Sequence, residues 1–171
     1  MYSFEREALG VESMGEIRGG VAVIGQIEMS SDPSVAWWLT SFYSPDIWDT
    51  WRVGLVRQSI CIAASSPIAL PSPMEFELPT DAGQPLDLPE VLPRRLIVCP
   101  ALVKERALGF VVRDPDAMAD SRLANPSPHL QVVAPTHLVE RLGLREAATV
   151  PLRILPAPAF RRERRPERGG L

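Results

Sequence analysis

The sequence predicts a mainly β protein: a small closed or partly closed barrel of six or seven strands with one short C-terminal helix. The first observation is a series of short apolar segments separated by turn residues, which is the pattern of β-strands. The second is the content of 18 prolines in 171 residues, which argues against a helical bundle. The third is a strand–helix–strand unit near the C-terminus. Closure into a barrel would remove the unpaired edges of such apolar strands.

The strands are expected in order along the chain, with loops and turns between them. A proline-rich loop should cover residues 65–93, a hairpin turn residues 104–106, and a polar loop residues 114–128. The expected strands cover residues 15–29, 50–64, 74–78, 94–103, 107–113, 130–133 and 149–154.

The single expected helix has a signal at each end. Pro135 ends the strand before it, and the hydroxyl of Thr136 suits the N-cap because it can accept a hydrogen bond from a first-turn amide. Leu138 and Leu142 lie four residues apart and therefore on one helical face. Gly143 suits the left-handed position just after the helix.

Length and charge favour one domain with polar ends. We expect an N-terminal arm over residues 1–14, a single barrel domain over 15–156 and a disordered arginine-rich tail over 157–171. The tail sequence RRERRPER carries a charge of about +3, which leaves the rest of the chain at about −6 for a net charge of −3. A nucleic-acid-binding domain is more often basic, so nucleic acid is not an expected partner.

The chain has no feature of a membrane or secreted protein. No apolar run approaches the roughly 20 residues of a membrane helix, and the first residues are polar and acidic, so the cytoplasm is the expected location. Cys61 and Cys99 lie in apolar runs and are expected to be buried thiols. Two cysteines and two histidines so dispersed form no zinc-binding motif, and no P-loop is present.

The C-terminal segments carry a resemblance to a known family. The sequences VVAP, LVERLGL and TVPLRI follow one another in the last third of the chain, and LIVCPALVKERALGFVVR precedes them. Together, over residues 94–154, they resemble the CTP-dependent, archaeal-type riboflavin kinases. The resemblance implies a cradle-loop (RIFT-type) β-barrel. It also implies transfer of a phosphoryl group from CTP to riboflavin, giving FMN, with Mg²⁺ as the metal.

The N-terminal half departs from the pattern of that family. The resemblance implies that Gly15, Gly19 and Gly20 bind nucleotide phosphates, but the later glycines of the family motif are replaced in GEIRGGVAVIG. The counterpart of the family's GTLNV motif is DTWRV. Here Thr50 keeps the hydroxyl that would contact phosphate and Mg²⁺, whereas Arg52 replaces the metal-binding asparagine. A guanidinium cannot bind a metal ion, but it can pair with a phosphate or lie on the surface.

Several aromatic residues cluster within residues 37–51, and the sequence allows two functions for them. Trp38 and Trp51 could stack on a flavin or a nucleobase. Alternatively, the segment could cover the barrel or form an interface with a protein partner or a second copy. The predicted function is accordingly a divergent riboflavin-kinase-like protein with weak or absent activity. The alternative is a non-catalytic ligand-binding or protein-interaction module on the same barrel.

Overall fold

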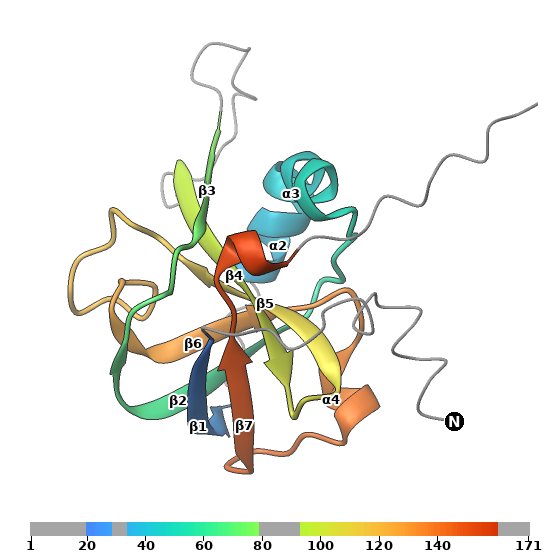
Figure 1. Cartoon of the computed structure of the whole chain (residues 1–171), viewed down its shortest axis with the longest axis vertical. Helices are drawn as coiled ribbons and strands as arrows, with labels where there is room; N and C mark the ends of the chain where they lie inside the picture. Colours follow the sequence, from blue (N-terminus) through green and yellow to red (C-terminus); the bar gives the residue numbers. More distant parts are fainter. Residues whose placement is uncertain (1–19, 29–33, 79–92, 161–171) are drawn as a thin grey trace, which may run out of the picture.

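The fold is a closed antiparallel β-barrel, seen in a computed structural model that describes residues 20–28, 34–78 and 93–160 (Figure 1). Six strands follow one another around the barrel in the order β4-β5-β6-β2-β1-β7, and β7 pairs with β4 to close it. A seventh strand, β3, pairs with β4 outside this ring. The predicted mainly β barrel is confirmed.

The strands agree with the sequence-based expectation in order and, for most, in position. Their bounds are β1 Val21–Glu28, β2 Ser59–Ile68, β3 Met74–Glu77, β4 Arg95–Val103, β5 Ala107–Arg113, β6 Ser127–Val133 and β7 Thr149–Ile154. The helical segments are α2 Ser34–Trp38, the π-helical turn η2 Leu39–Tyr43, α3 Ser44–Trp51, α4 Leu138–Leu142 and the 3₁₀ turn η3 Ala157–Ala159. The strand expected over residues 50–64 is wrong at its start, because residues 50 and 51 end α3.

Strand β4 changes its partner halfway along one edge, and a proline marks the change. Val98 is the last residue paired with β3, and Ala101 begins the pairing with β7. Between them, the carbonyl of Pro100 accepts a hydrogen bond of 2.8 Å from the Leu155 amide. Proline has no amide hydrogen to donate, so it fits at a position where the ladder is interrupted.

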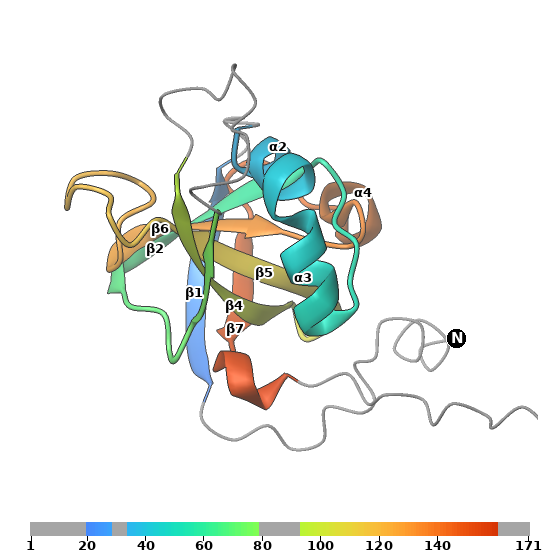
Figure 2. The same cartoon turned by 90° about the horizontal axis from the view of Figure 1, so that it is seen from above.

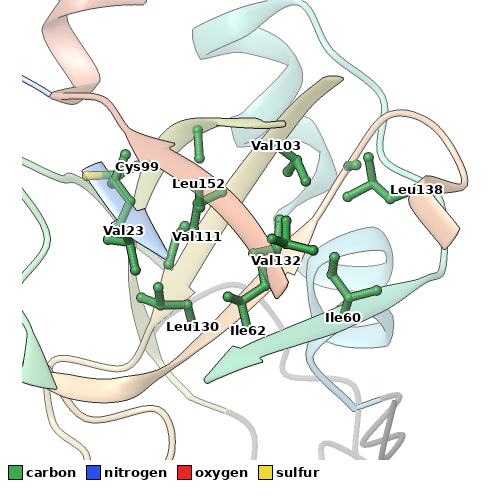
Figure 3. Close-up of a cluster of buried hydrophobic side chains, with 14 of the residues drawn as sticks. Val23, Ile60, Ile62, Cys99, Val103, Val111, Leu130, Val132, Leu138 and Leu152 are labelled. Atoms are coloured by element: carbon green, nitrogen blue, oxygen red, sulfur yellow. The ribbon is translucent and has the colours of Figure 1, made fainter. Parts of the chain in front are cut away.

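The barrel interior is filled by apolar side chains from all six strands (Figure 3). Along β4, alternate residues point inward and form this core, while the residues between them point outward and are also buried. Strand β1 shows ordinary alternation, with Val23 and Ile27 buried and the residues between them exposed except for Gly25. A Cβ on Gly25 would lie 2.5 Å from Ile62 Cγ2, so a glycine is required where β2 passes this close.

Helix α4 closes one end of the barrel. Leu138 is buried in the interior core beside Ile60 and Val103 (Figure 3). Gly143 ends the helix in the left-handed conformation, with φ of 61°, as the sequence predicts. The predicted N-cap is wrong by one residue: the helix begins at Leu138, so His137 occupies the N-cap position without a side-chain cap. Thr136 instead accepts a 3.5 Å hydrogen bond from Arg141.

A helical layer covers the outside of the barrel over β3, β4 and β5 (Figure 2). We use this name for residues 34–51, which form α2, η2 and α3 in succession. A proline in the first turn of α3 and Asp46 beside it are both favourable at a helix N-terminus. Ile47 and Trp51 then lie four residues apart and are buried against the sheet. The Trp51 ring lies 4.9 Å from the Phe110 ring.

The fold continues past the last strand. Ala157 and Phe160 are buried, and the Phe160 ring packs edge-on against Phe110 at 6.2 Å. The tail predicted to begin at residue 157 therefore begins no earlier than residue 161. Residues 1–14, assigned to an arm, and residues 161–171 lie outside the described residues. In the part that is described, no helix has the length and apolar character needed to cross a membrane.

Candidate functional site

The glycines assigned to phosphate binding lie at the N-terminal end of the described chain. Gly15 and Gly19 are outside the described residues. Gly20 is exposed and immediately precedes β1. A Cβ there would lie 3.0 Å from the carbonyl oxygen of Ile154, so this glycine allows the end of β7 to pass close by.

Thr50 and Arg52 lie together at the C-terminal end of α3. The Thr50 side chain is exposed in the last turn. Arg52 adopts the left-handed conformation with φ of 57°, and its amide donates a 2.7 Å hydrogen bond to the Trp48 carbonyl. Its guanidinium lies 3.8 Å from the Asp49 carboxylate, and both side chains are largely exposed. The backbone of Arg52 therefore serves as the helix C-cap, and the side chain points to solvent.

The two halves of the predicted phosphate site lie on different elements. Gly20 contacts the end of β7, whereas Thr50 and Arg52 belong to the helical layer outside the barrel. In both Figure 1 and Figure 2, η3 lies between the start of β1 and α3. The structure thus brings Thr50 and Arg52 together and separates them from Gly20.

The two tryptophans assigned to stacking are buried. Trp51 is 2% exposed and packs between Phe76 and Phe110, with ring centroids 5.6 and 4.9 Å away. Trp38 is 8% exposed and belongs to the same outer core. Either ring would have to leave this packing to stack on a ligand. Trp37 and Trp48, by contrast, are 39% and 50% exposed.

A group of metal-binding side chain types lies on the opposite outer face, at Glu28, Cys61 and His129. The three residues come from neighbouring strands β1, β2 and β6, and their ligand atoms all lie within 4.8 Å of one another. Cys61 Sγ lies 3.9 Å from His129 Nδ1, and that nitrogen lies 3.7 Å from Glu28 Oε2. We call these residues the Glu–Cys–His cluster. Among the described residues it is the one such group of three or more histidine, cysteine or carboxylate side chains.

The electrostatics of the cluster keep Cys61 protonated in the absence of a metal. Burial and, to a smaller extent, the negative charge of Glu28 together raise the pKa of the Cys61 thiol to about 11, while Arg122 opposes the shift. Arg122 donates a 2.8 Å hydrogen bond to Glu28 Oε2. The sequence shows no zinc motif, because these residues are far apart in the chain and only the strand register brings them together.

A buried arginine, which the sequence did not indicate, links the end of β2 to the start of β6 at the end of the barrel opposite α4. Arg113 is 0% exposed and donates hydrogen bonds to the carbonyls of Ile68, Ser127 and His129 and to Asn125 Oδ1. Burial lowers its pKa to about 10. Both terminal nitrogens of the guanidinium donate to these acceptors, so Arg113 holds the ends of β2 and β6 together and is not placed to bind an anion.

Comparison with known proteins identifies no relative. A scan against models of protein families gives no match, and a search of curated proteins finds none similar to this chain.

Proposed function

We propose that this protein is a non-catalytic binding module whose helical layer docks a protein partner. The observation that carries the proposal is the exposure of Trp37 and Trp48, at 39% and 50%, on a layer whose other face is buried against the barrel. Tryptophan is the residue type most enriched among the energetic anchors of protein interfaces. The helices are also held firmly, since Trp51 and its aromatic neighbours anchor them.

The surroundings of Trp48 resemble the rim of an interface. Asp49 and Arg52 are 77% and 53% exposed and lie within one helical turn of the ring. Charged residues around an aromatic centre favour one partner over another and exclude water from the anchor. The partner expected from this surface has an apolar pocket for an indole ring, with polar or charged groups around it.

Site-specific photo-crosslinking tests the proposal. A benzophenone amino acid at position 48 is expected to give a discrete crosslinked protein in cells, and the same probe at Met118, which is more exposed at 77%, is not. The captured protein, once purified, should bind the wild-type chain and lose at least about tenfold in affinity to Trp48→Ala. Identical adducts from positions 48 and 118, or none from position 48, would contradict the proposal.

Riboflavin kinase activity is the second candidate. Its support is the closed barrel ending in the strand–helix–strand unit that carries the resemblance. The expected roles of Gly20, Thr50 and Arg52 in phosphate binding, and of Thr50 at Mg²⁺, belong to this candidate alone.

Thermal-shift measurements with riboflavin, FMN and CTP, each with and without Mg²⁺, separate the two candidates. A binding module of the proposed kind shows no shift with any of them. A stabilisation by CTP that requires Mg²⁺ would favour the kinase and displace the first proposal.

A further inference from the structure

We propose that the Glu–Cys–His cluster is a binding site for a zinc-like divalent metal ion, with Glu28, Cys61 and His129 as the three protein ligands. The site lies on the outer face of β1, β2 and β6, away from the helical layer. The proposal is independent of the protein-docking function, because the two surfaces share no residue.

The strand register explains why three distant residues meet. Glu28 is paired directly with Cys61 across β1 and β2. Cys61 is paired with Gln131 of β6, and His129 lies two residues from Gln131 and so on the same face. Their inward-pointing neighbours, Ile27, Ile60, Ile62 and Leu130, form the barrel core. The cluster is therefore carried on three rigid, paired strands and needs no loop for its assembly.

Two of the three distances between the ligand atoms are close to those between ligands of one tetrahedral ion. With Zn–S of about 2.3 Å and Zn–N of about 2.05 Å, a tetrahedral angle separates the sulfur and nitrogen by about 3.6 Å. The observed separation of Cys61 Sγ and His129 Nδ1 is 3.9 Å. For nitrogen and a carboxylate oxygen the ideal is about 3.4 Å, and the observed separation is 3.7 Å. These two separations each need a contraction of about 0.3 Å. The third, between Cys61 Sγ and the Glu28 carboxylate, is at most 4.8 Å against an ideal of about 3.6 Å, and side-chain rotation of Glu28 would close it.

The ligand types select the class of metal. A thiolate, an imidazole and one carboxylate suit Zn²⁺ and similar transition ions, whereas Mg²⁺ and Ca²⁺ prefer oxygen ligands alone. On binding, the ion replaces the proton of the Cys61 thiol, which is released to solvent. Three protein ligands leave a fourth position for water or for a group of a bound molecule.

The cluster is also open to solvent, so that an ion can enter, and one of its ligands is held in place by a neighbouring side chain. Cys61 is buried at 2% exposure, while the Glu28 and His129 side chains are about 30% exposed and open the site to solvent. Arg122 holds the Glu28 carboxylate by a 2.8 Å hydrogen bond, which orients it as outer hydrogen-bond partners orient metal ligands.

The chain provides its own matched controls, because it contains only two cysteines and two histidines. Cys99 is also a buried thiol, but it points into the barrel and donates to the Pro71 carbonyl. His137 is exposed beside α4. Comparing Cys61 with Cys99, and His129 with His137, therefore distinguishes a loss of metal binding at the cluster from a general effect of losing a thiol or an imidazole.

The test is titration of the full-length reduced protein with Co²⁺ and Zn²⁺. We expect one ion per chain, a thiolate-to-cobalt charge-transfer absorption, and displacement of Co²⁺ by Zn²⁺. Cys61→Ser should abolish that absorption, and Glu28→Gln or His129→Gln should weaken binding by at least about tenfold. Cys99→Ser and His137→Gln should leave both unchanged.

Two results would overturn the proposal. One is the absence of stoichiometric binding by the wild-type protein. The other is an equal loss of binding in the cluster variants and their controls. Circular dichroism of each metal-free variant verifies folding. If Cys61→Ser does not fold, the partly exposed Glu28→Gln and His129→Gln still decide the outcome.

Discussion

The barrel has two outer faces that are built from similar strands, but one is buried under the helical layer and the other is partly exposed. Over β3, β4 and β5 the outward side chains are apolar and are buried under the helical layer. Over β1, β2 and β6 the outward positions include Glu28 and His129, which remain partly exposed. Strands β4 and β5 are buried on both sides, so their side chains contribute to stability. The outer side of β1, β2 and β6 is not covered by the helical layer and can therefore hold polar side chains.

The largest expected effect concerns the covered face. Trp51→Ala should lower the free energy of unfolding by about 3–5 kcal/mol, because it removes a fully buried ring that packs on Phe76 and Phe110. Chemical denaturation monitored by circular dichroism measures this change. The control, Trp48→Ala on the exposed side of the same helix, should change stability by less than about 0.5 kcal/mol. Equal effects of the two substitutions would mean that the helix does not pack as described.

The next effect tests the polar link at one end of the barrel. Arg113→Ala should cost about 3 kcal/mol, because it leaves several buried carbonyl oxygens without a charged donor. Arg113→Lys should recover part of this at most, since an ammonium group cannot reach the acceptors in the fork geometry of a guanidinium. Urea denaturation gives both values. Full stability of the lysine variant would show that a positive charge alone, without the planar guanidinium, is enough to hold the ends of β2 and β6 together.

A smaller effect tests how closely β1 and β2 approach on the side that faces the barrel interior. Gly25→Ala should cost about 1–3 kcal/mol, because the new methyl group would lie 2.5 Å from Ile62 Cγ2 and 2.8 Å from the Ala63 carbonyl oxygen. Gly54→Ala is the matched control, with no atom within 4 Å of its added Cβ. Thermal unfolding of the two variants side by side is sufficient. A neutral Gly25→Ala would indicate a wider spacing of these strands.

The smallest effect concerns pH. Burial raises the pKa of Asp114 above its ordinary value of 3.8, so its charge destabilises the folded state above that pKa. As pH falls through the raised pKa, the carboxyl binds a proton and this cost disappears. Asp114→Asn should therefore be slightly more stable than the wild type at neutral pH and lose that advantage below pH 3.8. Melting temperatures across this range provide the measurement, and an advantage that grows on acidification would contradict the assignment.

The sequence predicted the C-terminal half well and the helical layer poorly, for physical reasons. Strands β4 and β5 are short, continuous apolar runs joined by a short turn, and runs of this length are typical of buried strands. The pattern before β2 predicts a strand because Trp51 and Val53 alternate with polar residues, whereas Trp51 is the last residue of helix α3. The better signal was the repeat of apolar residues every four positions, at Val35, Leu39, Tyr43, Ile47 and Trp51, all of which are buried.

The candidate sites show a similar division. Arg52 was singled out from a motif, but its position at a helix end depends on where α3 stops. The Glu–Cys–His cluster was beyond prediction from spacing, because it requires the register of three strands that are adjacent only in the folded barrel. Sequence patterns report local structure, and this site is entirely non-local.

We infer that the outer face of β1, β2 and β6 serves metal binding, whereas the face under the helical layer serves stability. The most direct measurement is an anomalous diffraction map of a crystal grown with Zn²⁺. We expect a single strong peak within about 2.0–2.3 Å of ligand atoms of Glu28, Cys61 and His129. Ordered side chains at these three positions with no metal between them, in a crystal that holds zinc elsewhere, would contradict it.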